Sequence, residues 1–269
     1  MPFNERTEIK LATWNLNGAL SDPRRAETVA ETIIGTDGQV ISLQDAYILD
    51  PSESTPSGTK LKLPLDIFRD AGYEIVDLKH REVLLEGEDN SAIYQFMTLV
   101  KGWSYRRREI LREETNAVIF DIAMQDFVAR VVSVHLNDQS EKIRLRQVEA
   151  IKARLNLDMP TVVMGDFNSM HGDLMISKVT RARALRNPHP SKALLWLADK
   201  ARGDVLREFN KFGLEDVDAD RQPTMPSRLP KFQLDHVLVN DGLVATEYKV
   251  EHRPDESDHG LITSTVVLR

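Results

Sequence analysis

Short apolar segments of this chain repeatedly end or begin at carboxylate, amide or histidine side chains, and this feature constrains the fold most strongly. The residues at these ends are Asn15 and Asn17, Asp45, His135 and Asn137, Asp166 and Asn168, Asp235, and Asp258 with His259. Each segment has the length and composition of a buried β-strand. In α/β sheets, strand ends converge at one edge, where ligand sites form. The sequence therefore predicts a sheet protein with a polar site assembled from distant parts of the chain.

The expected strands alternate with helices along the chain. Asp22 and Pro23 are a typical start of the first helix (23–34), and Gly35 is a typical stop. Both hairpin-like pairs and strand–helix–strand units occur, which predicts mixed sheets. Strands are expected at 9–13, 39–43, 73–78, 92–101, 116–123, 128–136, 160–166, 234–239 and 261–268, further helices at 65–71, 142–155, 191–201 and 204–212, and a surface loop at 50–62. No repeat or linker divides the chain, so we expect residues 1–269 to form a single domain.

Composition narrows the chemistry and the setting of the protein. The chain has no cysteine, which excludes disulfides, thiolate catalysis and cysteine-ligated metal sites. Its 35 Lys and Arg against 42 Asp and Glu give a formal charge of −7, which argues against nucleic-acid binding over the whole surface but permits a local basic face. No signal segment is evident, and no stretch approaches the about 18 to 20 apolar residues of a membrane span. We therefore expect a cytoplasmic protein, monomeric by default.

The side chains at the strand ends favour one kind of metal site. Carboxylates, amides and two histidines collected at one sheet edge would form a hard, oxygen-rich site. Such a site suits Mg²⁺ or Mn²⁺, because it lacks the thiolates and the several imidazoles that zinc prefers. A divalent ion, an activated water and a histidine that can move protons are the requirements of phosphodiester hydrolysis.

Six short blocks at these strand ends also carry a family resemblance. They are ATWNLNG (12–18), SLQD (42–45), VHLN (134–137), GDFNS (165–169), LDHV (234–237) and SDH (257–259). Each block is weak alone, but together and in this order they resemble the endonuclease/exonuclease/phosphatase superfamily, which includes deoxyribonuclease I and abasic-site endonucleases. The resemblance implies an α+β fold of the deoxyribonuclease I type, a four-layer α/β sandwich in which two packed mixed β-sheets are flanked by helices.

The resemblance assigns one group of residues to a Mg²⁺ or Mn²⁺ ion. Asn15 matches the metal and phosphate end of the first strand, Asp45 takes the place of the family's metal-binding Glu, and Asp258 lies next to the metal. Asp45 departs from the family pattern, because its side chain is one methylene shorter and must reach the ion from a closer backbone or through a water. Weaker metal affinity, a shifted metal preference and low activity all stay open.

A second group is implied to act on the substrate. Asp166 matches the residue that orients or deprotonates the attacking water, and Asn168 matches the residue that hydrogen-bonds the phosphate. His259 matches the catalytic histidine beside the scissile phosphate, which Asp235 holds in orientation. His135 matches a second histidine of deoxyribonuclease-like and lipid-phosphatase members, placed to contact the phosphate or protonate the leaving group; a satisfied core histidine at the end of an apolar strand is the alternative.

Several neighbouring residues have two interpretations each. Asn17 either belongs to the site or caps a turn, and His171 is expected to be a plain loop histidine, with contact to a leaving group as the alternative. His236 faces away from the site on an alternating strand and is expected to be a packing or surface residue. Trp14 and Tyr47 either fill the core or stack on a ring of the substrate.

Positive charge is concentrated between residues 178 and 202. The basic residues there are Lys178, Arg181, Arg183, Arg186, Lys192, Lys200 and Arg202, against one acid, Asp199. We interpret the segment as a solvated helical face, with a flank that steers a polyanion as the sharper alternative. Arg106–Arg108 permits the same two interpretations with less support.

Residues and resemblance together predict a Mg²⁺- or Mn²⁺-dependent phosphoric ester hydrolase that cleaves a phosphodiester with an activated water. The basic segment favours a nuclease or another nucleic-acid-processing phosphodiesterase, with DNA or RNA as the substrate. A lipid or small phosphate ester is the alternative substrate, because substrate choice lies in loops that the motifs do not encode. An alternative of another class is a catalytically impaired binding module of the same fold, which Asp45 suggests.

Overall fold

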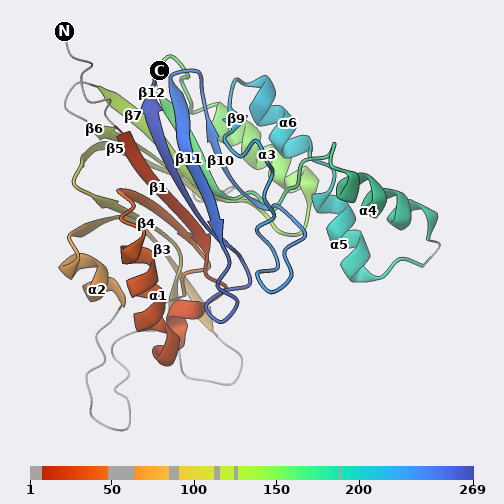
Figure 1. Ribbon diagram of the computed structural model, residues 1–269, viewed down its shortest axis with the longest axis horizontal. Coiled ribbons are helices and arrows are strands. Elements are labelled where there is room, and N and C mark those ends of the chain that lie inside the picture. The colour runs from red at the N-terminus through yellow and green to blue at the C-terminus, as the bar shows by residue number, and fades with distance from the viewer. Residues whose placement is uncertain (1–7, 48–63, 85–90, 112–115, 124–126, 188) are drawn as a thin grey trace.

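Two six-stranded β-sheets form the centre of the protein, which is described from a computed structural model (Figure 1). The structure describes residues 8–47, 64–84, 91–111, 116–123, 127–187 and 189–269. The strands are β1 (Glu8–Asn15), β2 (Val40–Gln44), β3 (Tyr73–Leu84), β4 (Ser91–Lys101), β5 (Ser104–Leu111), β6 (Asn116–Ala123), β7 (Val128–His135), β8 (Thr161–Asp166), β9 (Glu215–Asp216), β10 (Asp235–Val239), β11 (Leu243–Glu251) and β12 (Leu261–Leu268). The first sheet has the order β11-β12-β1-β2-β4-β3 and the second the order β5-β6-β7-β8-β10-β9. Both are mixed, because β1 and β2 pair in parallel, as do β7 and β8.

Helices flank the two sheets. They are α1 (Pro23–Gly35), α2 (Pro64–Asp70), α3 (Glu141–Lys152), α4 (Met175–Arg186), α5 (Lys192–Lys200) and α6 (Asp204–Lys211), with a short 3-10 helix at Ala19–Ser21. α1 and α2 pack on the first sheet through a core that includes Ile33 and Phe68. α3 and α6 pack on the second sheet through a core that includes Val148 and Phe209, whereas α4 and α5 project from the side of the sandwich (Figure 1). The expected four-layer α/β sandwich is therefore confirmed.

The layer between the two sheets changes from apolar to polar along the strands. In its apolar part, Leu11 of β1 belongs to one buried cluster with Val131 of β7 and Met164 of β8. Two residues further along β2 and β7, Ser42 Oγ and Ser133 Oγ hydrogen-bond to each other between the sheets. Because successive side chains of a strand alternate between its faces, the next inward positions extend this polar end of the layer.

The structure also contains strands and a helix that the sequence patterns do not predict: β5, β9, β11 and α4. β11 and β5 are edge strands, and β11 buries little of its surface, so its apolar alternation is weak. β5 contains Arg106–Arg108, whose run of charge conceals a strand, and β9 has only two residues. The expected loop at 50–62 lies outside the described residues. Among the helices within the described ranges, none combines the length and the apolar character needed to cross a membrane.

Candidate active site

Three strands of the second sheet present polar side chains to the inter-sheet layer at one level. In the strand register, His135 at the end of β7 and Asp235 at the start of β10 both lie opposite Asp166 at the end of β8. Gly165, just before Asp166, has φ 142°, and a Cβ there would lie 1.9 Å from the carbonyl oxygen of Val134. Only glycine therefore permits the close approach of β7 and β8 directly beside the site.

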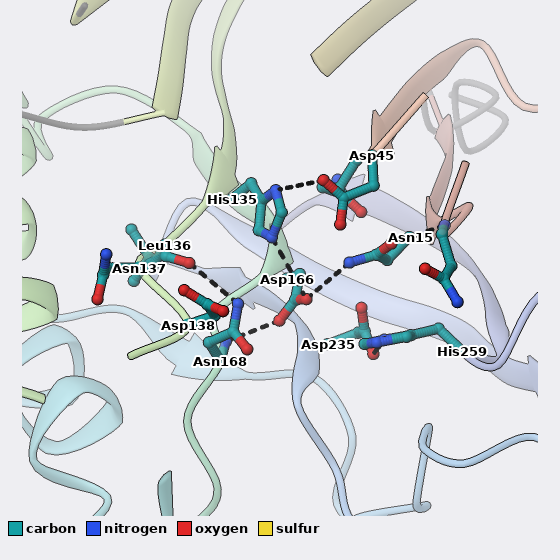
Figure 2. Close-up of polar contacts among 12 residues, drawn as sticks. Asn15, Asp45, His135, Leu136, Asn137, Asp138, Asp166, Asn168, Asp235 and His259 are labelled. Carbon is teal, nitrogen blue, oxygen red and sulfur yellow. Dashed lines mark hydrogen bonds and ion pairs between the residues drawn. The ribbon is translucent and has the colours of Figure 1, made fainter. Parts of the chain in front are cut away.

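The first sheet contributes side chains from its own strand ends (Figure 2). Asn15 ends β1, Asp45 follows β2 directly, and His259 lies two residues before β12. Asn15 Nδ2 donates to Asp166 Oδ2 at 2.9 Å, which joins residues 151 positions apart in the sequence. The polar ends of both sheets therefore meet in one site.

Asp166 is buried, and the surrounding groups favour its ionised form. Asn168 N donates to Asp166 Oδ1 at 2.7 Å. Burial by itself would raise the pKa of Asp166, but His259, His135 and Lys200 outweigh this effect and hold the pKa below its usual range. Asp166 is therefore a carboxylate that can accept a hydrogen bond from a water.

His259 is paired with Asp235 inside the site. His259 Nδ1 lies 2.8 Å from Asp235 Oδ2, which also accepts a 2.6 Å hydrogen bond from Thr224 Oγ1. Trp14 Nε1 donates to the backbone carbonyl of His259 at 2.9 Å, which holds the segment before β12 in place. Burial opposes the charged imidazolium, but the Asp235 carboxylate overcomes that effect and raises the pKa of His259 to about 10. At neutral pH, His259 is therefore a cation that can donate from Nε2.

Asp45 and His135 complete the site on its other side. In Figure 2, His135 lies between two carboxylates, with Nδ1 3.7 Å from Asp45 Oδ1 and Nε2 3.7 Å from Asp166 Oδ2. Asp45 has φ 46°, a left-handed conformation that Asp tolerates better than most residues. Burial raises the pKa of Asp45, and the Asp166 charge adds to this, although His135 opposes it. A bound cation would relieve this crowding of negative charge.

The donor set fits a divalent cation with oxygen ligands. Asp258 Oδ1 is buried and has no hydrogen-bond partner among the described residues. Asn15 Oδ1 accepts one hydrogen bond, from Asn17 N at 3.0 Å, and a carbonyl oxygen has a second lone pair. A buried carboxylate oxygen without a partner calls for a ligand, and carboxylate and amide oxygens are the ligands that Mg²⁺ and Mn²⁺ take. Asn15, Asp45 and Asp258 are the residues that could hold such an ion.

Lys200 is a site residue that the sequence interpretation missed. It was expected on a basic surface, but its side chain is fully buried, and Nζ donates to Asn168 Oδ1 and, at 3.0 Å, to the carbonyl oxygen of Asp138. Nζ also lies 4.3 Å from the ring centre of Trp196. Burial lowers the pKa of Lys200 to about 8, although Asp166 favours the charged form. Because Asn168 Nδ2 donates to the Leu136 carbonyl at 3.0 Å, Lys200 fixes the other end of the same amide.

A close backbone contact brings Lys200 to the site. Met170 N donates to the Lys200 carbonyl at 2.9 Å, just after the Asp166–Asn168 segment. A Cβ on Gly172 would lie 2.3 Å from the carbonyl oxygen of Arg202, and a Cβ on Gly203, at φ 70°, would lie 2.3 Å from Gly172 N. The two glycines therefore allow the loop after β8 to lie against the end of α5. No pattern in the sequence distinguishes Lys200 from the exposed lysines and arginines around it, because burial here depends on packing between distant segments.

The residues beside the site differ in burial and in backbone conformation. Trp14 is fully buried, so it fills the core, and stacking on a substrate is wrong for this residue. Asn17 is exposed at φ 44° in a turn, with its backbone N–H on Asn15 Oδ1, and Tyr47 is half-buried. Asn137 Oδ1 accepts from the backbone N–H groups of residues 139 and 140 before α3, which is a capping role.

The rest of the basic segment is exposed and lies on the projecting part of the molecule. We call α4 and α5 the basic arm; its exposed basic residues are Lys178, Arg181, Arg183, Arg186 and Lys192, followed by Arg202. A groove of about 630 Å³ lies against the arm, with Arg181, Lys192 and Trp196 among its lining residues. The side chains of Arg106–Arg108 lie outside the described residues.

Comparisons with known proteins identify the family. The profile of the Endonuclease/Exonuclease/phosphatase family matches residues 12–259, and the chain belongs to this family. Its members are hydrolases that act on phosphoesters, and the family is generally dependent on divalent metals.

Solved structures of the family show the same fold. An endonuclease/exonuclease/phosphatase from Beutenbergia cavernae superposes with a TM-score of 0.66 at 14% identity, over 98% of this chain and 72% of that one. An AP endonuclease from Archaeoglobus fulgidus gives 0.64 at 14% identity, over 95% and 98%. The AP endonuclease LMAP from Leishmania major gives 0.62 at 15%, over 98% and 89%. Identities this low show the fold alone. A comparison with curated protein sequences finds no match.

Proposed function

We propose that this protein is a phosphodiesterase dependent on Mg²⁺ or Mn²⁺, that it hydrolyses nucleic acid with an activated water, and that residues 1–269 act as one domain. The observation that carries the proposal is the meeting of an ionised Asp166, the His259–Asp235 pair and the carboxylate of Asp45 at the polar end of the inter-sheet layer. One domain is supported by the first sheet, which joins β1 to β12 from opposite ends of the chain.

In the proposed reaction, water attacks phosphorus and the bond to the leaving oxygen breaks. Asp166 accepts a hydrogen bond from the water, and its low pKa makes it better at orienting the water than at removing a proton completely. His259 donates from Nε2 to a phosphoryl oxygen, where its positive charge stabilises the charge that develops. Asn168 donates to the phosphate with the amide hydrogen that the Leu136 carbonyl does not use.

His135 is the candidate proton donor to the leaving oxygen, because its ring lies between Asp45 and Asp166 at the site. Asn15, Asp45 and Asp258 would hold the Mg²⁺ or Mn²⁺ ion, which when bound supplies positive charge to the phosphoryl oxygens. The shorter Asp45 side chain starts from a left-handed backbone conformation directly after β2. This local geometry supports an adapted ligand over an impaired binding module.

Nucleic acid is the proposed substrate class because of the basic arm. The loop after Asp166 and Asn168 leads directly into α4. The exposed arginines of α4 therefore follow the site residues closely in the sequence. Cations in this position attract a polyanion and extend its contact beyond the cleaved phosphate. Among the structurally similar proteins, the two AP endonucleases are named for action on nucleic acid. A small phosphate ester would not need this extended cationic surface.

The proposal is tested by substrate hydrolysis with and without metal. The protein is incubated with bis(p-nitrophenyl) phosphate, plasmid, single-stranded DNA, RNA and a phosphoinositide panel in Mg²⁺, Mn²⁺ or EDTA. We expect EDTA-sensitive cleavage of a nucleic acid, abolished by Asp166→Asn and His259→Ala with unchanged circular dichroism. Asp158→Asn, at an exposed aspartate, is the matched control and should keep full activity. Turnover of the phosphoinositides alone would refute the nucleic-acid assignment, and no turnover of any substrate would refute the enzyme.

A further inference from the structure

Three side chains with metal-binding groups meet on the outer face of the second sheet, away from the active site. His236 of β10 points to the opposite face from Asp235, and its Nδ1 lies 2.6 Å from Asp216 Oδ2 on β9. His171, in the loop after β8, directs Nε2 to the same oxygen at 3.0 Å. The three ligand atoms lie within 4.8 Å of one another. Side-chain exposures of 0% for His236, 7% for Asp216 and 17% for His171 make this a largely enclosed cluster.

Hydrogen-bond accounting shows that the contact between His236 and Asp216 needs an additional proton or a metal ion. His236 Nε2 lies 2.8 Å from the carbonyl oxygen of Ser169, which can only accept, so Nε2 carries a proton. Nδ1 of the same ring then faces Asp216 Oδ2, and that contact requires either a second proton or a metal ion. Asp216 Oδ1 is already used by Asp218 N at 3.1 Å, so a single carboxylate oxygen faces both imidazoles.

The contact between His236 and Ser169 is the kind that supports a metal ligand. Metal-binding histidines usually donate their other ring N–H to a carbonyl or carboxylate, which fixes the tautomer and the ring orientation. Ligand bonds of about 2.0–2.1 Å to zinc place neighbouring ligand atoms about 3.3 Å apart in a tetrahedron. The contacts of 2.6 and 3.0 Å around Asp216 Oδ2 therefore need to lengthen by less than about 1 Å.

A cavity beside the cluster supplies access and an open coordination position. It has a volume of about 330 Å³, and His171 and Asp216 line it together with apolar residues that include Leu206. Its two arginines are already paired with acids: Arg221 Nη1 lies 2.8 Å from Asp173 Oδ2, and Arg207 Nη1 lies 2.8 Å from Asp204 Oδ1. A water in the cavity could complete a four-coordinate site.

We propose that His171 Nε2, Asp216 Oδ2 and His236 Nδ1 bind a Zn²⁺ ion, separately from the metal of the active site. The donor set distinguishes the two sites: two imidazoles and one carboxylate suit Zn²⁺, whereas the oxygen ligands of the active site suit Mg²⁺ or Mn²⁺. The site also fastens the loop that carries Asn168, because the His236 ring bonds to Ser169 in that loop.

Calorimetric titration with ZnCl₂ in saturating Mg²⁺ tests the site, since Mg²⁺ fills the oxygen-ligated position. We expect one equivalent of Zn²⁺ to bind and His171→Ala to weaken binding at least 10-fold. Loss of a residue that only hydrogen-bonds to a metal ligand already weakens metal affinity about 10- to 100-fold, so loss of a ligand should cost no less. His189→Ala, at an exposed histidine, is the matched control and should bind as the wild type does. Asp166→Asn should also keep the Zn²⁺ site.

A zinc-edge anomalous map of Zn²⁺-soaked crystals gives a second measurement that does not depend on a variant. A peak bonded to His171, Asp216 and His236 would establish the ligands. The absence of binding in Mg²⁺ would overturn the proposal and leave a proton-linked ion pair. Equal Zn²⁺ affinity in His171→Ala and the wild type would overturn it as well, as would binding that Asp166→Asn abolishes.

Discussion

Replacing Lys200 by methionine should lower catalytic activity much more than it lowers the stability of the fold, because Lys200 positions the Asn168 amide. Lys200 is fully buried and donates to Asn168 Oδ1 and Asp138 O. Hydrogen bonds from a charged donor contribute about 1.5–3 kcal/mol each, but methionine also removes the cost of burying an ammonium. The two effects partly offset each other, so we expect the free energy of unfolding to fall by only about 1–2 kcal/mol.

Activity should respond more strongly than stability. Without the Lys200 contact, the Asn168 amide loses its orientation toward the phosphate, and Asp166 loses a nearby positive charge that lowers its pKa. Loss of one preorganised donor costs up to about 10²–10³ in kcat, and Asn168 is still present, so we expect a fall of about 10- to 100-fold. KM should change much less, because the charge of the phosphate is bound by other groups. Lys142→Met, at an exposed lysine of α3 outside the basic arm, should leave kcat unchanged.

Two measurements distinguish positioning from a general loss of structure. In a double-mutant cycle, Lys200→Met should have little further effect once Asn168→Ala is present, because both changes remove the same interaction. The wild-type kcat should also fall above pH 8, where Lys200 loses its proton, and this alkaline decline should be absent in Lys200→Met. Additive effects of the two substitutions, or a kcat within twofold of the wild type, would refute the reasoning.

Three further outcomes are expected. Asp45→Glu should leave the Mg²⁺ concentration for half-maximal rate unchanged, because the left-handed backbone at this position is adapted to Asp; a lower Mg²⁺ requirement would show instead that the shorter side chain weakens the site. The raised pKa of His259, about 10, gives stability that is fully present below the unfolded value of about 6.5 and is lost as pH rises, at about 1.4 kcal/mol per pH unit. Without metal, the wild type should therefore lose about 2 kcal/mol more than Asp235→Asn between pH 6.5 and pH 8, measured by denaturant unfolding, and parallel pH curves would contradict the pairing. Neutralising the exposed arginines of α4 should make binding to short duplex DNA less salt-dependent, by about 0.9 in the log–log slope per lost phosphate contact, whereas equal slopes would remove the basic arm from the binding surface.

Local patterns sufficed for most elements of the fold. The start and stop signals around α1 and the apolar runs of β7, β8 and β12 predict these elements to within a few residues. The edge strand β11 and the projecting helix α4 were not predicted, because neither has the periodic apolar face that burial against a sheet imposes. Such elements are held in place by neighbouring elements, and their own sequences contain little of the apolar periodicity from which secondary structure is predicted.

The sequence by itself determined which side chains of each strand share a face. Strand alternation turns Asp166 toward the inter-sheet layer and His236, one residue after Asp235, toward the outer face, whatever the partners are. The tertiary structure alone decided which faces meet: it brought Asn15 to Asp166 across the two sheets and buried Lys200 against Asn168. It also joined His171 to His236 through Asp216, away from the active site. The physical reason is that periodicity is a property of local backbone geometry, whereas contacts between distant segments depend on how whole layers pack.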